Sequence, residues 1–267
     1  MKNKQAMLCS PCGIRVWRGF RSRAFFNDRE GFDKIIGEVF VPQTAQQMEP
    51  LGLCAYFPAL LPDSIPPGSN DQFLKIPDEV ALVVYPSKEY YQRAATSSVA
   101  GRAYSLLHWP FFNGYDPDIP RSQSGHPEPW AGTLDWDVPY YLVPDAIDWR
   151  SGVTHLLVAR PLFSMKPEVF CEHLNTVIRD WLEKRERHIN GSVIFACPEY
   201  LLYWEHREMD CDHDSLIPRL LPLLESPYLN SAATPVIVPP AFHEPDEGVN
   251  IRVGECLNVR VDIYKQQ

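Results

Sequence analysis

The sequence predicts an α+β protein made of two copies of one sheet-and-helix unit. The first observation behind this prediction is that the two halves of the chain show their expected strands and helices in the same order. The second is that the longest uninterrupted apolar runs have only the length of a strand. The third is composition: of 267 residues, 45% are hydrophobic and 12% aromatic, which is enough for a sizeable core and too many for a disordered chain.

The first half opens with a strand whose apolar and polar residues alternate, so that Ile14 and Val16 share one face. Asp28 then provides the N-cap of a helix, and Pro42 is expected to disturb the end of that helix. Ser87 provides the N-cap of a second helix. The expected elements of this half are a strand at 14–23, a helix after residue 28, strands at 51–60 and 79–85, and a helix at 87–107.

Two proline-rich loops interrupt the first half, at 62–78 and 113–130. Proline makes up 26 of the 267 residues, about twice its usual share of about 5%. Because proline and glycine gather in both segments, we expect exposed loops there. An extended aromatic stretch at 130–143 follows and is expected to be the last strand of this half.

The second half repeats the order of elements. Its clearest helix, at 166–188, has Pro167 in its first turn and the pair Asn190-Gly191 after its end. The expected elements are a strand at 154–163, this helix, strands at 192–196 and 200–204, a short helix at 215–224, and late strands at 236–238 and 249–263.

Each half therefore follows the order strand, helix, strand, strand, helix, strand. That order is typical of a ferredoxin-like unit, in which two helices cover one face of an antiparallel sheet. We predict an α+β fold with two such units in tandem, each with its own antiparallel sheet. The first unit spans residues 1–150 and contains the proline-rich loops, and the second spans residues 151–267.

This repetition resembles the dimeric α/β-barrel superfamily in its tandem-repeat form. The residues that carry the resemblance are 14–60 and 80–112, matched by 154–204 and 216–242, and above all 85–112, a strand ending in tyrosine, a helix and an aromatic exit. Members of the superfamily include cofactor-free monooxygenases, polyketide cyclases, haem-binding enzymes and proteins without known activity. The resemblance therefore implies a fold rather than a chemistry. The proline-rich loops depart from the superfamily and could cover or replace its usual pocket.

The aromatic exit of the second helix provides the candidate site. An imidazole at His108 can move protons or ligate iron if it faces a cavity between sheet and helices. The structural alternative is a histidine that binds the last carbonyls of its helix. His108 and Tyr104 are the candidate catalytic residues. The candidate substrate-binding residues are Trp17, Tyr56, Tyr91 and Trp109, and Phe57 and Tyr90 belong to the same aromatic set, in which some members are expected to be simple core residues.

Three other clusters carry chemistry-bearing residues. The segment 205–214 holds two histidines, a thiol and five carboxylates, but its spacing matches no metal motif and a solvated acidic turn is expected there. Cys9 and Cys12 have zinc or redox spacing, yet no second such pair exists and we expect them in a mobile terminus. Carboxylates and rings alternate through 130–149, which fits a sugar site or an edge strand with rings inward. No metal site is therefore predicted.

Charge and composition limit the partners and the compartment. The net charge of −9 argues against nucleic-acid binding through phosphate attraction. No signal peptide and no apolar run of membrane-spanning length is visible, so we expect a cytoplasmic protein that does not bind membranes and whose seven cysteines are reduced. The expected partner is a small-molecule substrate, and a homodimer is a further option.

We therefore expect an enzyme that acts on a small, largely apolar or aromatic substrate in an aromatic-lined pocket. Its reaction would resemble that of a monooxygenase, a cyclase or an isomerase, with His108 or a buried tyrosine in acid–base catalysis. No cofactor is expected, although haem stays open because of the histidine. The alternative is a non-catalytic interaction or assembly protein built on the duplicated units. RNA processing is the least favoured function because a basic stripe is lacking.

Overall fold

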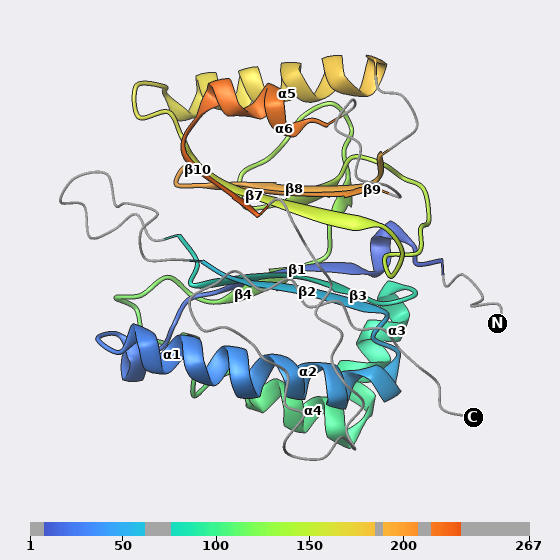
Figure 1. The fold of residues 1–267 in the computed structure, drawn as a ribbon, viewed down its shortest axis with the longest axis vertical. Helices are drawn as coiled ribbons and strands as arrows, with labels where there is room; N and C mark the ends of the chain where they lie inside the picture. Colours follow the sequence, from blue (N-terminus) through green and yellow to red (C-terminus); the bar gives the residue numbers. More distant parts are fainter. Residues whose placement is uncertain (1–7, 62–75, 185–188, 208–214, 231–267) are drawn as a thin grey trace.

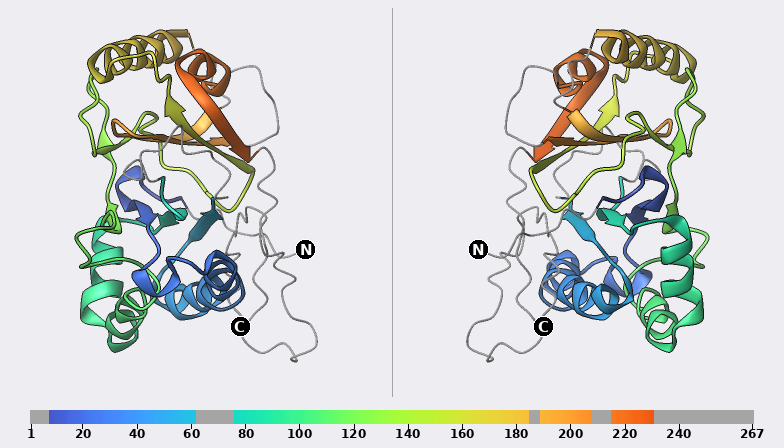
Figure 2. Two further views of the ribbon diagram at one scale, coloured as in Figure 1. Left: turned by 90° about the vertical axis from the view of Figure 1, so that its left-hand side faces the viewer. Right: turned by 90° about the vertical axis from the view of Figure 1, so that its right-hand side faces the viewer.

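The computed structural model describes residues 8–61, 76–184, 189–207 and 215–230 and shows an α+β fold with two sheets. The two sheets stack face to face, and helices cover the outer face of each, so that four layers follow one another (Figure 1). The side views in Figure 2 show the same succession of helices, sheet, sheet and helices. The α+β class predicted from the sequence is therefore confirmed.

The first sheet has four strands in the order β2-β3-β1-β4, and all of its pairs are antiparallel. The expected strands at 14–23, 51–60 and 79–85 are present in shortened form. The expected loop at 113–130 is wrong in part, because β4 lies inside it. The strands are β1 (Ile14–Gly19), β2 (Ala55–Leu60), β3 (Glu79–Val84) and β4 (Gln123–Gly125).

The second sheet has six strands in the order β10-β7-β9-β8-β6-β5. The aromatic stretch expected to complete the first half instead contributes β6, which pairs with β8, and β5, which pairs parallel to β6. These two strands precede residue 150 and yet belong to the second sheet, and the domain boundary there stays a prediction. The strands are β5 (Glu128–Pro129), β6 (Pro139–Tyr141), β7 (Val153–Pro161), β8 (Ile189–Ala196), β9 (Leu201–Arg207) and β10 (Leu224–Asn230).

Strand β10 was not expected, because the sequence pattern placed the returning strand later in the chain. The backbone of β10 pairs antiparallel with β7, and its register shifts between Glu225 and Tyr228. Pro227 lies at this shift. The regular pairing of the two strands is already broken there, so the N–H that proline lacks is not needed for a hydrogen bond between them. The late strands expected at 236–238 and 249–263 lie outside the described residues.

The first helical segment covers the outer face of the first sheet and runs through three parts. The expected N-cap is confirmed, since the Asp28 side chain accepts a hydrogen bond from the Gly31 N–H. Helix α1 (Arg29–Ile35) continues through a π-helical turn, Ile36–Phe40, into α2 (Val41–Met48). Pro42 follows closely after the π-helical turn, so the helix is irregular next to this proline but does not end there.

The single helix expected over 87–107 is divided into two. It consists of α3 (Lys88–Gln92), a π-helical turn at Arg93–Ser97, and α4 (Val99–Leu106). Between them Ser98 adopts an extended conformation, accepts a hydrogen bond from the Gly101 N–H and donates one to the Ala94 carbonyl. A side chain at Gly101 would strike the same carbonyl, so glycine is required for this close approach.

Two helices, α5 (Pro167–Lys184) and α6 (Ile217–Leu220), cover the outer face of the second sheet. The expected helix at 166–188 is therefore present over its described part. Its buried stripe is Phe170, Leu174, Ile178 and Trp181. No helix of the described segments has the length and apolarity to cross a bilayer, and the cytoplasmic location stays a prediction.

Strand β1 contributes to two cores at once. Ile14 and Val16 belong to the apolar cluster between the two sheets, which also contains Trp149 and Trp204. Trp17 packs against the cluster between the first sheet and its helices. Because successive side chains of a strand point to opposite faces, Arg15 and Trp17 face the helices when Ile14 and Val16 face the second sheet.

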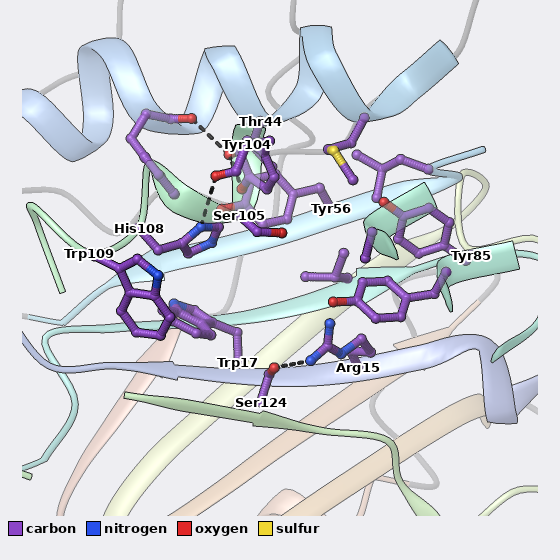
Figure 3. A pocket seen from close by; sticks show the side chains of 16 residues that line it. Arg15, Trp17, Thr44, Tyr56, Tyr85, Tyr104, Ser105, His108, Trp109 and Ser124 are labelled. Atoms are coloured by element: carbon purple, nitrogen blue, oxygen red, sulfur yellow. Dashed lines mark hydrogen bonds between the residues drawn. The ribbon is translucent and has the colours of Figure 1, made fainter. Parts of the chain in front are cut away.

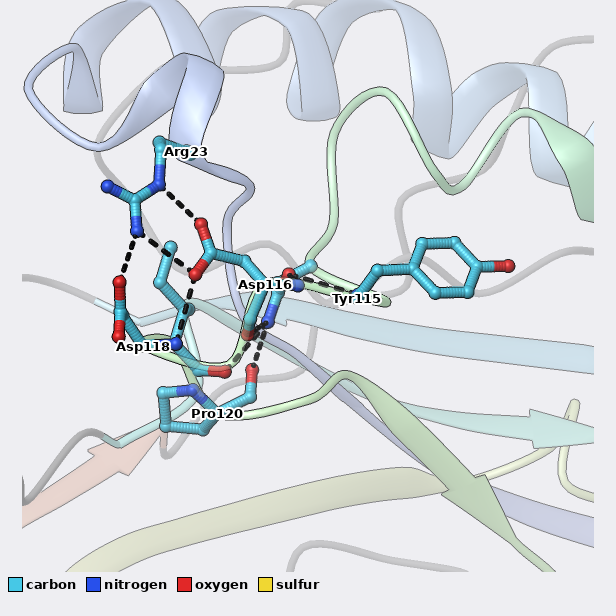
Figure 4. Close-up of polar contacts among 7 residues, drawn as sticks. Arg23, Tyr115, Asp116, Asp118 and Pro120 are labelled. Atoms are coloured by element: carbon cyan, nitrogen blue, oxygen red, sulfur yellow. Dashed lines mark hydrogen bonds and ion pairs between the residues drawn. The ribbon is translucent and has the colours of Figure 1, made fainter.

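The loop that leads into β4 is closed by one buried amide and by the surface contacts of Arg23 with Asp116 and Asp118, which Figure 4 shows. The Asn113 side chain, 4% exposed, donates to the carbonyls of Asp116, Ile119 and Pro120 and accepts from two backbone N–H groups. At the surface, Arg23 pairs with both Asp116 and Asp118. The buried amide, rather than the exposed ion pairs, is expected to determine the stability of this loop.

We expect Asn113→Ala to lower the free energy of unfolding by about 2 kcal/mol or more, because it leaves several carbonyls and N–H groups without their partner. The matched control in the same loop, Asp118→Ala, removes an exposed ion pair and should change this free energy by less than about 0.5 kcal/mol. Urea unfolding followed by circular dichroism measures both. Equal effects of the two substitutions would contradict this assignment.

Candidate functional site

A cavity of about 220 Å³ lies between the first sheet and the helices that cover it (Figure 3). All four strands of the sheet contribute to its floor, through Arg15, Trp17, Tyr56, Val83 and Ser124. The helical segments form its roof. The principal roof residues are Phe40, Thr44 and Met48 from the first helical segment and Ala95, Tyr104 and His108 from the second.

The structure brings all six candidate site residues to this one cavity. His108 and Tyr104 line it, and so do the four residues proposed for substrate binding, Trp17, Tyr56, Tyr91 and Trp109. Their roles stay predictions. Two other aromatic candidates lie elsewhere, because Phe57 packs between the sheets and Tyr90 is 47% exposed at the surface.

His108 is enclosed by aromatic rings and held by its own helix. Its ring centroid lies 4.9 Å from those of Phe40 and Tyr104 and 5.2 Å from that of Trp17. Its Nδ1 is 3.3 Å from the Tyr104 carbonyl oxygen. A carbonyl oxygen only accepts, so Nδ1 carries the proton and Nε2 keeps a lone pair. His108 therefore binds a carbonyl of its own helix, as the structural alternative expects, and it also lines the cavity.

The surroundings of His108 keep its imidazole neutral. Burial lowers the pKa of His108 to about 4, although hydrogen bonds to the backbone act in the opposite direction. At neutral pH the ring is therefore unprotonated and can serve as a base but not as an acid. Burial also raises the pKa of the Tyr104 phenol, which stays protonated.

Tyr104 is engaged through its hydroxyl group. The Thr44 hydroxyl donates to the Phe40 carbonyl at 2.8 Å, which uses its only proton. The Tyr104 hydroxyl, 2.7 Å from the Thr44 oxygen, must then be the donor in that pair. The phenolic oxygen of Tyr104 keeps its lone pairs and can accept a hydrogen bond from a bound molecule.

A buried carboxyl group on the cavity side of the first sheet holds two rings of the cavity floor. Glu79 of β3, fully buried, accepts a hydrogen bond from Trp17 Nε1 at 2.9 Å and another from the Tyr56 hydroxyl at 3.2 Å. These two donors come from the strands on either side of β3. Burial raises the pKa of Glu79 from 4.5 to about 7, against the opposite effect of the two hydrogen bonds.

Sequence reasoning missed several polar residues of this site. Arg15 and Ser124 line the cavity, and Glu79 holds two of its rings. The alternation in β1 already placed Arg15 on the face of Trp17, which is the pattern that could have identified it. Glu79 is the one acid in an otherwise apolar strand, and such a position indicates a buried, partnered carboxyl group.

The segment 205–214 was expected to be a solvated turn, and this is wrong for its first part. Glu205, His206 and Arg207 belong to β9 and are buried. The Glu205 carboxylate pairs with Arg207, and His206 Nδ1 lies 2.8 Å from the Thr154 hydroxyl. Residues 208–214 lie outside the described residues. Among the residues that are described, no three potential ligands gather into a metal site.

The remaining two clusters are not assembled into sites. Cys9 is not in a mobile terminus, because its backbone pairs with Ile147 and its side chain is buried between the sheets, whereas Cys12 is exposed. The carboxylates of 130–149 have separate partners: Asp135 accepts from Tyr140, and Asp148 pairs with Arg150.

We expect Glu79→Gln to change how stability depends on pH. The native pKa of about 7 lies above the ordinary 4.5, so wild-type stability falls as pH rises through this interval, when the buried group must ionise. The amide does not ionise. The stability of the variant relative to wild type should therefore rise by up to about 3 kcal/mol between about pH 4.5 and pH 8.

Urea unfolding at a series of pH values measures this difference. Glu183→Gln, an exposed change on α5, is the control and should run parallel to wild type. If the stability of Glu79→Gln ran parallel to that of wild type across this pH range, burial would not raise the pKa of Glu79, and the prediction would be wrong.

Neither a protein-family profile nor a curated protein sequence matches this chain. Among solved structures, it resembles a protein from Fusobacterium nucleatum subsp. nucleatum that is provisionally named a monooxygenase, with 9% identity, a TM-score of 0.36, and coverage of 81% of this chain and 88% of that chain. It also resembles an anthrone oxidase-like protein, with 11% identity, a TM-score of 0.31, and coverage of 83% and 92%. Similarities this low carry no argument about activity, so the function must be argued from the cavity.

Proposed function

We propose that this protein is an enzyme that removes a proton from a small aromatic or largely apolar substrate in the cavity beneath its first helical layer. The observation that carries the proposal is the neutral imidazole of His108 in the wall of an aromatic-lined cavity. The deprotonated substrate then either reacts with molecular oxygen, as in a monooxygenase, or cyclises or isomerises without an oxidant.

His108 acts as the general base in this proposal. Its Nδ1–H is held by the Tyr104 carbonyl, which fixes the ring and leaves the Nε2 lone pair to take the proton. The imidazolium formed is balanced by the negative charge that develops on the substrate. This attraction is strong because rings, rather than water, surround His108.

The cavity selects a small and flat substrate. Its volume of about 220 Å³ is below the range of about 300–1,000 Å³ that is typical of drug-sized ligands. The rings of Trp17, Tyr56, Tyr91 and Trp109 offer edges and faces to an aromatic body. The Tyr104 oxygen accepts a hydrogen bond from the substrate and orients it.

The residues of the cavity do not fit a haem. A macrocycle needs more room than this volume provides, and the His108 ring is packed against four other rings. Nδ1 is also occupied by a carbonyl oxygen, so only Nε2 could ligate iron. We therefore propose a reaction without haem, in which the side chains of the cavity act on the substrate and molecular oxygen is the only possible co-reactant.

We further propose that the two halves are duplicated ferredoxin-like units whose sheets close against each other within one chain. In support, the strands of each half, numbered in chain order, lie in the order four, one, three, two, as β4-β1-β3-β2 and β10-β7-β9-β8. The apolar cluster between the sheets provides the contact that a second chain would otherwise supply. A homodimer stays a prediction.

The proposal is tested with 2-tetralone, a small bicyclic ketone with acidic C–H bonds beside its carbonyl. Wild-type protein in D₂O should accelerate deuterium incorporation, followed by NMR, and His108→Ala should lose about 10²-fold or more of that acceleration. His173→Ala, an exposed histidine on α5, is the matched control and should behave as wild type.

No acceleration by the wild type, or an equal rate for His108→Ala with an unchanged melting temperature, would contradict the proposal. The first of these results is what the alternative function, a non-catalytic assembly protein, requires. Oxygen consumption recorded in the same samples separates a monooxygenase-like reaction from an isomerisation.

A further inference from the structure

Arg15 lies at the end of the cavity opposite to His108 and Trp109 (Figure 3). Its guanidinium carbon stacks 3.8 Å from the centroid of the Tyr91 ring, and Nη2 donates to the Ser124 hydroxyl. Its Nε atom is buried without a hydrogen-bond partner. The side chain is thus positioned by a ring and a hydroxyl group, while part of its donor capacity remains unused.

Arg15 differs from five other buried or half-buried arginines in its lack of a carboxylate partner. Arg18, Arg21, Arg29, Arg150 and Arg207 are all buried or half-buried, and each forms an ion pair with an aspartate or glutamate. Within the described part of the chain, Arg15 forms none. The ionisable groups that raise the pKa of Arg15 are the phenols of Tyr85 and Tyr104, and neither is a carboxylate.

The unpaired charge persists at neutral pH. Burial lowers the pKa of Arg15 to about 10, which still leaves the guanidinium protonated under physiological conditions. A buried cation without an anion is unfavourable, and proteins normally pair such a group. A guanidinium presents planar, paired donors that match the two oxygens of a carboxylate.

We propose that Arg15 binds a carboxylate group of the substrate, so that the natural substrate is a small aromatic carboxylic acid. This inference rests on the proposed function and deepens it. With its carboxylate at Arg15, the aromatic body extends along Tyr56 and Trp17. The opposite end of the substrate, which carries the proton to be removed, then lies near His108.

The test compares two probes of nearly equal shape, 2-naphthoate and 2-naphthamide, by isothermal titration calorimetry. Wild-type protein should bind the naphthoate about tenfold to hundredfold more tightly than the amide. Arg15→Gln should remove this preference and leave the affinity for the amide within about threefold. Arg15→Lys retains the charge and should keep part of the preference. Arg102→Gln, an exposed change on α4, is the control and should bind both probes as wild type does.

Each outcome decides a separate point. If wild type binds both probes equally, or if Arg15→Gln keeps the preference, the carboxylate assignment is wrong, whereas the proposed aromatic site stands. If wild type binds neither probe, both the assignment and the proposed function fail. If Arg15→Gln does not fold, the wild-type comparison together with Arg15→Lys still decides.

Discussion

The site depends on the two-sided character of strand β1. Every second side chain of this strand, Ile14 and Val16, is committed to the core between the sheets. The intervening residues, Arg15 and Trp17, must then face the helices, where they form the floor of the cavity. A slip of the register by one residue would replace Ile14 and Val16 by Arg15 and Trp17 in the core between the sheets, so the packing of the sheets also fixes the position of the site.

The two halves share a strand order but differ in how they fill the space beneath their helices. In the second half, α5 presents a continuous buried stripe of large side chains to its sheet. In the first half, two π-helical turns and the extended residue Ser98 interrupt the helices on either side of the cavity. Such interruptions are frequent at functional sites. In the first half, the cavity thus lies between a regular sheet and helices that are interrupted.

Periodicity in the sequence predicted the main strands and helices, and the cluster of rings around His108 identified one wall of the cavity. Strand β4 was missed because Gln123–Gly125 has no apolar alternation and its pairing with β1 is non-local. Strand β10 was missed because Pro227 is untypical of a strand interior. Arg15 and Glu79 escaped because a single charged residue in a strand usually faces water, and only the packed structure shows what surrounds it.

The central claim is that His108 is a neutral base whose Nε2 lone pair is available in the cavity. The most direct measurement is the ¹⁵N chemical shift of both ring nitrogens of His108, followed by NMR as pH is lowered. We expect the tautomer protonated at Nδ1, with a midpoint for protonation near 4. A ring protonated at Nε2 instead, or a midpoint near the ordinary value of about 6.5, would contradict it.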